Sequence, residues 1–157
     1  MKNTKINTTQ ILNEGKTHHA YIASPFFNEN QLTRVELVET LLEKHGLTYF
    51  SPRKDSACEN IHDPEVRKRV FELNVENIKN AEFVIAITDD KDTGTMIELG
   101  IAYSLGIPVI GVAFTLKEGQ LYNLMIAEAC YSTARNKTEL EKILVEGATI
   151  EYKGLIE

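Results

Sequence analysis

The sequence predicts an α/β protein, with a five-stranded doubly wound parallel sheet in flavodoxin-like strand order and helices on both faces. Three observations favour this fold. Strand-length apolar runs alternate with segments whose apolar residues recur at helical spacing. The run FVIAI at residues 83–87 is apolar throughout, which is typical of a strand covered on both faces. Crossovers between parallel strands are right-handed, so few topologies remain.

The first part of this sheet is predicted as a strand, a helix and a second strand. The run YIA at residues 21–23 indicates a strand, and Pro25 ends it because proline cannot donate a backbone hydrogen bond. Residues 29–45 carry apolar side chains at helical spacing, and Gly46 suits the end of that helix. Residues 47–50 form the second predicted strand, which stops before another proline.

The middle of the chain is predicted as a loop, a helix and the central strand. Residues 53–63 are polar and indicate a loop. Pro64 fits the first turn of a helix that runs to about residue 80. The expected apolar face of this helix consists of Val66, Val70, Leu73 and Ile78. The apolar strand at 83–87 follows, and the polar loop at 88–92 comes after it.

The last third of the chain continues the alternation. We expect a helix at 93–105, a strand at 108–114, a short helix at 121–129 and a strand near 130–134. A final helix is capped by Asn136 or Thr138 and runs through residue 144. The tail at residues 149–157 is apolar enough to dock on the rest of the chain.

Length, charge and cysteine content limit the class of protein. A chain of 157 residues fits one domain of roughly 150, which we assign to residues 18–157. The polar N-terminal extension at residues 1–17 is either a mobile arm or a packing extension. A net charge of −6 disfavours nucleic-acid polymers and membranes as partners, and no apolar stretch approaches the roughly 20 residues of a membrane span. Cys58 and Cys130 lack disulfide-framework spacing, so we expect a soluble, cytoplasmic protein.

Several common kinds of site have no signal in the sequence. A Gly-x-Gly-x-x-Gly run after the first strand and a Walker-type Gly-Lys-Ser/Thr are both missing, which disfavours dinucleotides and triphosphates as ligands. The four histidines show no metal-ligand spacing with one another or with cysteine. Ser24 lacks the Gly-x-Ser-x-Gly context of a hydrolase nucleophile. These three kinds of site are therefore disfavoured.

Sheets of this kind bind ligands beyond the carboxyl ends of their strands, near the point where the strand order reverses. The segment DTGT at residues 92–95 leads there from the central strand into a helix, and Glu98 follows in the first turns of that helix. The helix dipole favours the ionised, nucleophilic form of Glu98. Ordinary alternatives stay open: Glu98 as a capping or salt-bridging residue, Asp92 as the helix N-cap, and Gly94 as a turn residue rather than a close approach to a ligand.

Three motifs together resemble the nucleoside 2-deoxyribosyltransferase family. They are YIASPFF at residues 21–27, DTGTxxELG at residues 92–100 and YNLM at residues 122–125. They occur in the family's order and spacing, and the resemblance extends from about Tyr21 to the end of the sequence. Each motif alone is weak, whereas three on the predicted fold are fairly specific.

The resemblance implies transfer of a 2′-deoxyribosyl group from a 2′-deoxynucleoside to a free purine or pyrimidine base, with retained anomeric configuration. Glu98 corresponds to the nucleophile that forms a covalent deoxyribosyl-enzyme ester. Asp92 corresponds to the acidic residue that exchanges protons with the base. Tyr21 corresponds to the residue that steadies the nucleophile and crowds the 2′ position. A retaining double displacement is therefore expected. The resemblance implies no metal and no redox cofactor, because the leaving base needs only a proton.

The resemblance also implies which residues bind the substrate. Phe26 and Phe27 would form a wall against the base. Asn123 and Met125 correspond to the sugar-contacting segment, with Asn123 supplied by a neighbouring subunit. We therefore expect a homo-oligomer with shared sites, either a dimer or a hexamer built of dimers.

Two positions depart from the family's pattern. Asn74 stands where many members have an aspartate, and an amide cannot exchange a proton although it can donate and accept hydrogen bonds. Asn74 is either a base contact or purely structural. Family members often end in an aromatic residue whose terminal carboxylate reaches an active site, whereas this sequence ends in Glu157, to which we extend that role.

Two other functions stay open at this point. The first is hydrolysis of the N-glycosidic bond of a 2′-deoxynucleoside 5′-monophosphate on the same fold, with water as the acceptor. The aromatic and acidic segment PFFNE at residues 25–29 fits a phosphate poorly. The second is a non-enzymatic nucleoside-binding or receiver-like module. Asp89 and Asp90 resemble part of a receiver's acidic cluster, but the first predicted strand ends without an acid.

Overall fold

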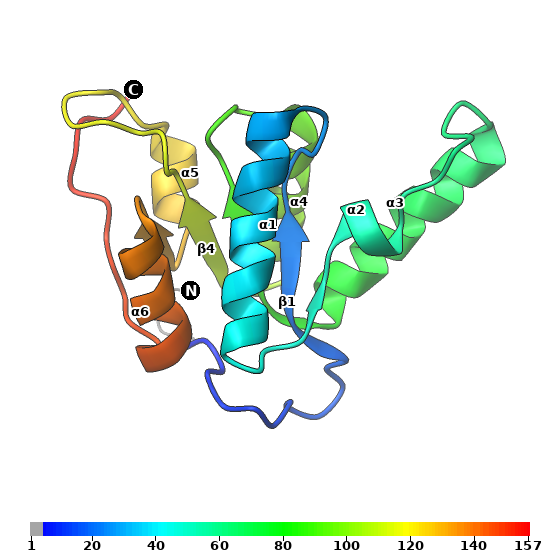
Figure 1. Ribbon diagram of the computed structural model, residues 1–157, viewed down its shortest axis with the longest axis horizontal. Helices are drawn as coiled ribbons and strands as arrows, with labels where there is room; N and C mark the ends of the chain where they lie inside the picture. The colour runs from blue at the N-terminus through cyan, green and yellow to red at the C-terminus, as the bar shows by residue number, and fades with distance from the viewer. Residues whose placement is uncertain (1–4) are drawn as a thin grey trace.

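The computed structural model describes residues 5–157 and contains a five-stranded, all-parallel sheet in the order β2-β1-β3-β4-β5 (Figure 1). The strands are β1 (His18–Ala23), β2 (Tyr49–Phe50), β3 (Ala81–Ile87), β4 (Val109–Val112) and β5 (Ser132–Ala134). The strand order reverses between β1 and β3, which lie side by side. The predicted fold class and the flavodoxin-like strand order are therefore confirmed.

Helices cover both faces of the sheet (Figure 1). On one face lie α1 (Glu29–Lys44) and α6 (Lys137–Glu146). On the other face lie α3 (Pro64–Lys79), α4 (Thr93–Ser104) and α5 (Leu124–Ala129). A further one-turn helix, α2 (Pro52–Asp55), follows β2 directly. The doubly wound arrangement predicted from the alternating pattern is thus present.

The core consists of two layers, one on each side of the sheet. Successive residues of a strand point to opposite faces, so Ala20 and Ile22 pack under α1 and α6, whereas Tyr21 and Ala23 face α4. All seven residues of β3 are buried, as its uninterrupted apolar pattern predicts. The alternation within β1 matters for function because it sends Tyr21 to the face that carries α4.

β1 is longer than predicted, because it starts at His18 rather than at residue 21. Two histidines therefore lie in a buried strand, and each ring has hydrogen-bond partners. The His18 ring contacts the backbone oxygen of Asn77 at 2.9 Å, and the His19 ring contacts the hydroxyl of Thr48 at 3.0 Å. Such bonds offset the cost of burying an imidazole, which a hydropathy pattern alone does not reveal.

The start of α5 and the presence of α2 differ from the prediction. α5 begins at Leu124, three residues later than predicted, because the Asn123 side chain accepts a hydrogen bond from the Ile126 amide and acts as its N-cap. α2 replaces the first residues of the predicted loop at 53–63. Pro52 occupies its first turn, where the missing amide hydrogen does no harm.

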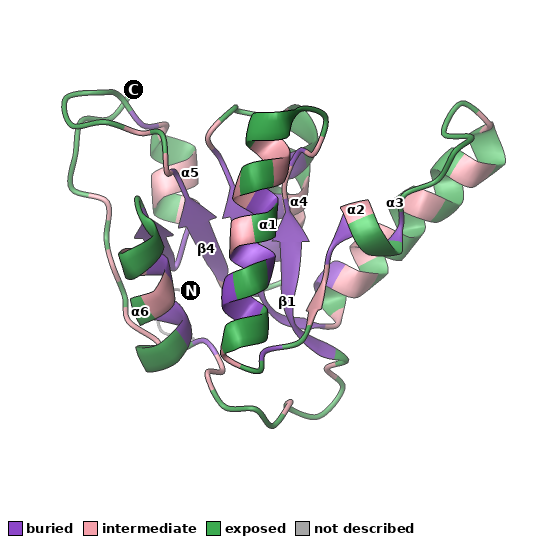
Figure 2. Cartoon of the chain, viewed as in Figure 1, coloured by how far each residue is buried: buried purple, intermediate pink, exposed green. Residues whose placement is uncertain are grey.

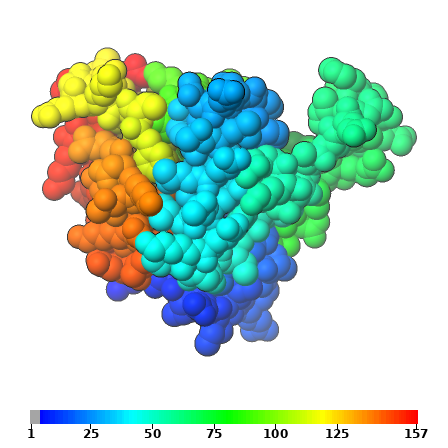
Figure 3. Space-filling view, in the orientation of Figure 1, coloured from blue at the N-terminus to red at the C-terminus, as the bar shows by residue number. Residues whose placement is uncertain are grey.

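The expected apolar face of α3 is largely uncovered (Figure 2). Of that face only Ile78 is buried, while Leu73 and the neighbouring Phe71 are exposed. Figures 1 and 3 show why, because the α2–α3 connection and the first half of α3 project away from the body. The predicted apolar face is therefore fully covered by the rest of the chain only at Ile78, near the end of the helix.

Both ends of the described chain pack against the fold. Residues 5–17 run beside the start of β3, where the Glu82 carboxylate accepts hydrogen bonds from Asn7 and Asn13, and Ile6 is buried. These residues form a packing extension, and residues 1–4 of the predicted extension lie outside the described part. The predicted docking of the tail is confirmed by a bridge between Tyr122 and Ile156. None of the helices within residues 5–157 is long and apolar enough to cross a membrane.

Candidate active site

A pocket of about 350 Å³ lies where the strand order reverses, beyond the carboxyl ends of β1 and β3. This volume lies within the roughly 300–1,000 Å³ that small-molecule sites occupy. Its walls come from the β1–α1 loop, α2 and the loop after it, α3, and the start of α4. Six of the predicted site residues line it: Phe26, Phe27, Asn74, Asp92, Gly94 and Glu98.

Glu98 is held in this pocket by Tyr21. The Tyr21 hydroxyl donates a hydrogen bond of 2.6 Å to Oε1 of Glu98. Tyr21 is fully buried and its ring stacks on Phe50 at 5.6 Å between centroids, so the hydroxyl has a fixed position. Burial and the Glu98 carboxylate raise the pKa of Tyr21, which keeps its hydroxyl protonated as a donor. Within residues 5–157, no cation pairs with Glu98 and it caps no helix end, so neither ordinary alternative applies.

Tyr21 fits one of its two expected roles. It bonds the nucleophile candidate, but its side chain is buried behind Glu98 and does not belong to the pocket wall. The expectation that Tyr21 crowds the 2′ position stays a prediction. The contact of Tyr21 with the site runs through Glu98.

The pKa of the Glu98 carboxyl is raised to about 7. Burial is the largest cause, the nearby Asp92 carboxylate raises the pKa further, and the hydrogen bond from Tyr21 opposes both. The net direction is thus opposite to the ionised form expected from the helix dipole, and loss of hydration is the largest cause. Both forms of the carboxyl group are populated near neutral pH.

Asp92 both caps α4 and lines the pocket. Its Oδ2 accepts hydrogen bonds from the Thr95 amide at 2.8 Å and from the Thr95 hydroxyl at 3.0 Å. The N-cap alternative is therefore confirmed, and it places the carboxylate beside Glu98. A Cβ atom at Gly94 would lie 3.2 Å from Oδ2 of Asp92, so the glycine leaves room for this cap. The turn and the pocket wall thus use the same residues.

The rest of the pocket lining includes two phenylalanine rings and the side-chain amide of Asn74. The rings of Phe26 and Phe27 lie 5.0 Å apart, and Phe27 is three-quarters exposed at the rim. Asn74 projects from α3 into the pocket, where its Oδ1 accepts a 2.8 Å hydrogen bond from the Ser56 hydroxyl. Asn74 therefore has a structural partner and also reaches the site.

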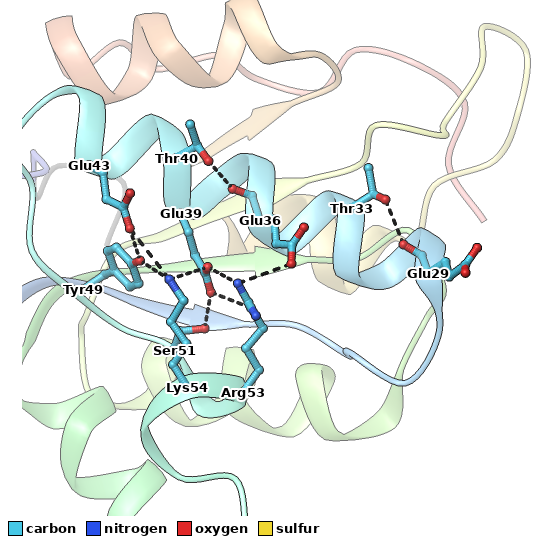
Figure 4. Close-up of polar contacts among 10 residues, drawn as sticks. All are labelled: Glu29, Thr33, Glu36, Glu39, Thr40, Glu43, Tyr49, Ser51, Arg53 and Lys54. Atoms are coloured by element: carbon cyan, nitrogen blue, oxygen red, sulfur yellow. Dashed lines mark hydrogen bonds and ion pairs between the residues drawn. The ribbon is translucent and has the colours of Figure 1, made fainter.

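The short helix α2 is fixed to α1 by a buried carboxylate (Figure 4). Glu39 of α1 is 2% exposed and accepts hydrogen bonds from the Ser51 hydroxyl at 2.6 Å and from the Arg53 guanidinium at 2.9 and 2.5 Å. The Lys54 ammonium lies 2.9 Å from Oε2 of Glu39, an oxygen that Arg53 also contacts. Burial raises the pKa of Glu39, but these partners together hold it below its ordinary value. Glu39 thus fixes the segment that leads to Ser56.

The three remaining predicted residues lie elsewhere in the chain. Asn123, Met125 and Glu157 line a separate, mostly apolar hollow of about 510 Å³ beside α4 and α5. Met96 and Gly100, which face this hollow, lie on the other side of α4 from Glu98. One chain therefore does not bring these three residues to the Glu98 pocket. The Glu157 side chain pairs instead with the Lys91 ammonium at 2.7 Å.

Sequence reasoning missed part of the pocket wall. Ser56, Cys58, Ile61 and Val70 line the pocket, and none of them was a candidate. The Ser-Pro pair at residues 51–52 is a helix-start signal that would have predicted α2. A glutamate at position 39, between apolar helix positions, signals a buried carboxylate that needs partners. Nothing local marks Cys58 or Ile61, which lie in an irregular loop.

Metal binding has no geometric support in the described part of the chain. Across residues 5–157, no three His, Cys, Asp or Glu side chains gather closely enough to hold an ion. Glu98 and Asp92 are the pocket's two carboxylates, and each is engaged by a neutral donor.

Fold and pocket together define a flavodoxin-like α/β protein that holds two carboxylates at the reversal of its strand order. The family model for nucleoside 2-deoxyribosyltransferase matches residues 20–155. The chain therefore belongs to the nucleoside 2-deoxyribosyltransferase family, a family of enzymes that act on nucleosides and nucleobases. The resemblance predicted from the three motifs is confirmed.

Solved structures agree with this assignment. A 2-deoxyribosyltransferase from the psychrotolerant bacterium Bacillus psychrosaccharolyticus is 36% identical, with a TM-score of 0.77 over 85% of this chain and 98% of that one. A conserved protein from Enterococcus faecalis V583 is 20% identical (TM-score 0.53, covering 87% and 91%). A CMP N-glycosidase from Clostridium botulinum is 19% identical (TM-score 0.52, covering 80% and 97%). The last two share the fold. No protein of curated function matches the chain.

Proposed function

We propose that this protein transfers the 2-deoxyribosyl group of a 2′-deoxynucleoside to a free purine or pyrimidine base. The observation that carries this proposal is the Glu98 carboxylate in the pocket, held by the buried Tyr21 hydroxyl at 2.6 Å. Membership of the family and the 36% identity to a 2-deoxyribosyltransferase support it. The reaction needs only a nucleophile, a proton source and space for one nucleoside.

In the first half-reaction, an oxygen of ionised Glu98 attacks C1′ of the donor nucleoside. The C1′–N bond breaks, and its electron pair goes to the base nitrogen, which takes a proton from Asp92 in its acid form. The transition state is oxocarbenium-like, so an anion next to C1′ stabilises the developing positive charge. The product is a deoxyribosyl ester of Glu98 and a free base.

The second half-reaction runs in reverse with another base. A nitrogen of the acceptor base attacks C1′, the ester bond breaks, and Glu98 regains its charge. The proton lost by the acceptor nitrogen returns to Asp92. Two inversions at C1′ give overall retention. A pKa of about 7 for Glu98 suits this cycle, because the carboxylate is both formed and released near neutral pH.

Hydrolysis of a nucleoside 5′-monophosphate is less well supported. The described residues that line the pocket include two carboxylates but no lysine, arginine or histidine. A phosphate dianion would therefore meet like charges without a compensating cation. A free 5′-hydroxyl group fits this lining better.

We further propose that the active unit is an oligomer in the cytoplasm. Asn123 and Met125 resemble the family's sugar-contacting segment but lie outside the Glu98 pocket of their own chain. A symmetric neighbour that brings its Asn123 to this pocket would complete the site. Cys58 and Cys130 are both free thiols, which suits a reducing compartment.

Base exchange tests the proposed function directly. Thymidine or deoxyinosine is incubated with adenine, and the products are separated by chromatography; we expect deoxyadenosine and the released base. Incubation with the donor alone should add one deoxyribosyl mass to the wild-type protein, and none to Glu98→Ala. Asp92→Asn is the matched variant, because asparagine keeps the N-cap but cannot supply the proton, so exchange should fall while the fold persists. Exchange by Glu98→Ala at the wild-type rate would overturn the assignment.

A further inference from the structure

The two oxygens of the Asp92 carboxylate have different surroundings. Oδ2 accepts hydrogen bonds from the Thr95 amide at 2.8 Å and from the Thr95 hydroxyl at 3.0 Å. Oδ1 has no hydrogen-bond partner within residues 5–157 and is not buried. Asp92 and Thr95 both line the pocket that holds Glu98. Oδ1 is therefore the oxygen of Asp92 that is left free to exchange a proton.

The direction of the hydroxyl bond follows from its chemistry. A threonine hydroxyl carries a single proton, and an ionised carboxylate can only accept. Thr95 is 1% exposed, and Asp92 is the one acceptor that its hydroxyl contacts within residues 5–157. The hydroxyl therefore donates to Oδ2, and its burial leaves water little room to replace the bond.

We propose that Thr95 is a positioning residue for proton transfer, because its hydroxyl keeps Oδ2 of Asp92 engaged and leaves Oδ1 to carry the proton. This inference rests on the proposed function, in which Asp92 protonates the departing base. A proton on Oδ2 would compete with two donors that already point at this oxygen, so the acid form of Asp92 carries its proton on Oδ1. When the C1′–N bond breaks, that proton moves to the base, and both Thr95 donors stay bound to the carboxylate that remains.

Substitution can separate the hydroxyl of Thr95 from its backbone amide. Thr95→Val keeps the shape of the side chain and the amide bond that caps α4, but it removes the hydroxyl. Asp92 is then held by one bond instead of two, so its proton is less well placed. We expect kcat/KM to fall about 3- to 10-fold for a donor whose base must be protonated. Thr95→Ser restores the hydroxyl and should recover most of this loss.

Two pairs of donors distinguish proton transfer from a general loss of structure. Thymidine and 5-trifluoromethyl-2′-deoxyuridine have nearly the same shape, but the trifluoromethyl group stabilises the charge of the departing base, which then depends less on a proton. The base of 7-methyl-2′-deoxyguanosine is positively charged and leaves as a neutral molecule without a proton, and 2′-deoxyguanosine is its counterpart. With hypoxanthine as the acceptor, Thr95→Val should lower kcat/KM for thymidine and 2′-deoxyguanosine by about 3- to 10-fold. For the other two donors the loss should be less than about twofold.

Two controls show whether the effect belongs to the hydroxyl and passes through Asp92. Thr93→Val is the matched substitution, since Thr93 lies in the same turn of α4, is exposed, and has no side-chain partner within residues 5–157. Its donor ratios should equal those of the wild type. In an Asp92→Asn background, Thr95→Val should leave the donor ratios unaltered, since there is no acid to position. Melting temperatures check that each variant is folded.

The outcomes separate this proposal from the proposed function. If the wild-type protein exchanges bases but Thr95→Val affects both donors of a pair equally, the positioning role is overturned and the transferase function stands. A lack of recovery in Thr95→Ser, or the same change of ratio in the Asp92→Asn background, would also overturn the positioning role. If the wild-type protein exchanges the base of none of these donors, the transferase function fails, and the role of Thr95 fails with it.

Discussion

At the scale of single residues, two opposing effects determine the pKa of the Glu98 carboxyl group. Burial and Asp92 favour the neutral form of Glu98, while the Tyr21 hydroxyl favours the ionised form. A buried carboxylate is a stronger nucleophile because it has lost part of its hydration, but it must first ionise. Under the proposed mechanism, the hydrogen bond donated by Tyr21 would therefore set the fraction of the enzyme that carries an ionised nucleophile at a given pH.

This balance predicts the pH dependence of the first half-reaction. Only the ionised form attacks C1′, and its pKa is about 7, so the rise of kcat/KM for ester formation with pH should have its midpoint near pH 7. Tyr21→Phe removes the bond that lowers the pKa, so the midpoint should move to higher pH. At pH 7 the variant should lose about 10- to 100-fold in kcat/KM, because a hydrogen bond to a charged group is lost. Rapid-quench measurement of the deoxyribosyl adduct between pH 5 and 9 checks both statements.

Tyr152→Phe serves as the matched control for this experiment. It is the same substitution on a tyrosine whose hydroxyl makes only 3.3 Å contacts with backbone oxygens, away from Glu98. Its profile should overlay the wild type. An unchanged midpoint for Tyr21→Phe would show that the hydroxyl does not tune Glu98.

The sequence identified Glu98 and Asp92 because both positions follow from the end of a buried strand and the start of a helix. It could not give the sign of the pKa shift of Glu98, which depends on burial by residues distant in sequence. Tyr21, for example, is 77 positions away from its partner. The contact between Ser56 and Asn74 was hidden for the same reason, since it joins an irregular loop to α3.

At the scale of elements, the walls of the pocket are held in place in two different ways: some by apolar packing in the core and others by polar contacts. β1, β3 and α4 carry Glu98 and its partner from the core of the sheet, and their buried patterns made them predictable. α2 and the loop behind it have one turn of helix and little apolar burial, so their position depends on the polar contacts of Glu39. The Ser-Pro pair at residues 51–52 signals the start of α2, but local sequence patterns cannot supply the contacts that fix its position against α1.

Replacement of the anchor tests the role of α2. Glu39→Gln keeps the side-chain size but removes the charge that Arg53 and Lys54 contact, so we expect unfolding free energy at pH 7 to fall by about 1–3 kcal/mol. The pKa of Glu39 is lower in the folded state, so its contribution is present above the unfolded value and is lost as the pH falls through the folded value. The difference between variant and wild type should therefore shrink at acidic pH, as urea titrations can measure.

The same variant should affect binding more than chemistry. A loosened α2 shifts Ser56 and the base-facing wall, so KM for the acceptor base should rise several-fold while the pH midpoint set by Glu98 stays in place. Glu36→Gln, an exposed neighbour on α1 that lies 3.7 Å from Arg53, is the control and should change stability by less than about 0.5 kcal/mol. Equal effects of the two substitutions would mean that burial of Glu39 is unimportant.

At the scale of the whole molecule, apolar surface remains on the side of α4 and α5 that faces away from Glu98. Tyr103 is 43% exposed and Met125 is 74% exposed, and both line the hollow of about 510 Å³ beside these helices. Exposed apolar patches of this kind mark contact surfaces. The same surface holds Asn123, which caps α5 with its side chain.

A shared site predicts that two inactive variants restore each other. Glu98→Ala lacks the nucleophile, and Asn123→Ser keeps an N-cap for α5 but loses the amide that would contact the sugar. In a mixed two-fold dimer, one of the two pockets then combines an intact Glu98 with an intact Asn123. Mixing equal amounts after dissociation and reassembly should recover roughly a quarter of wild-type exchange, since half of the dimers are mixed and each has one complete pocket.

Sedimentation of the same mixture shows whether recovery depends on assembly. The separate variants should sediment as the wild type does and exchange bases poorly, and activity should return only in the reassembled fraction. Met125→Glu places a charge on the exposed apolar surface and should shift the protein toward monomers, whereas Ile11→Glu, an equally exposed residue of the N-terminal extension, should not. A Met125→Glu monomer with full activity would show that the pocket is complete within one chain, because Asn123 could then have no part in the neighbour's site.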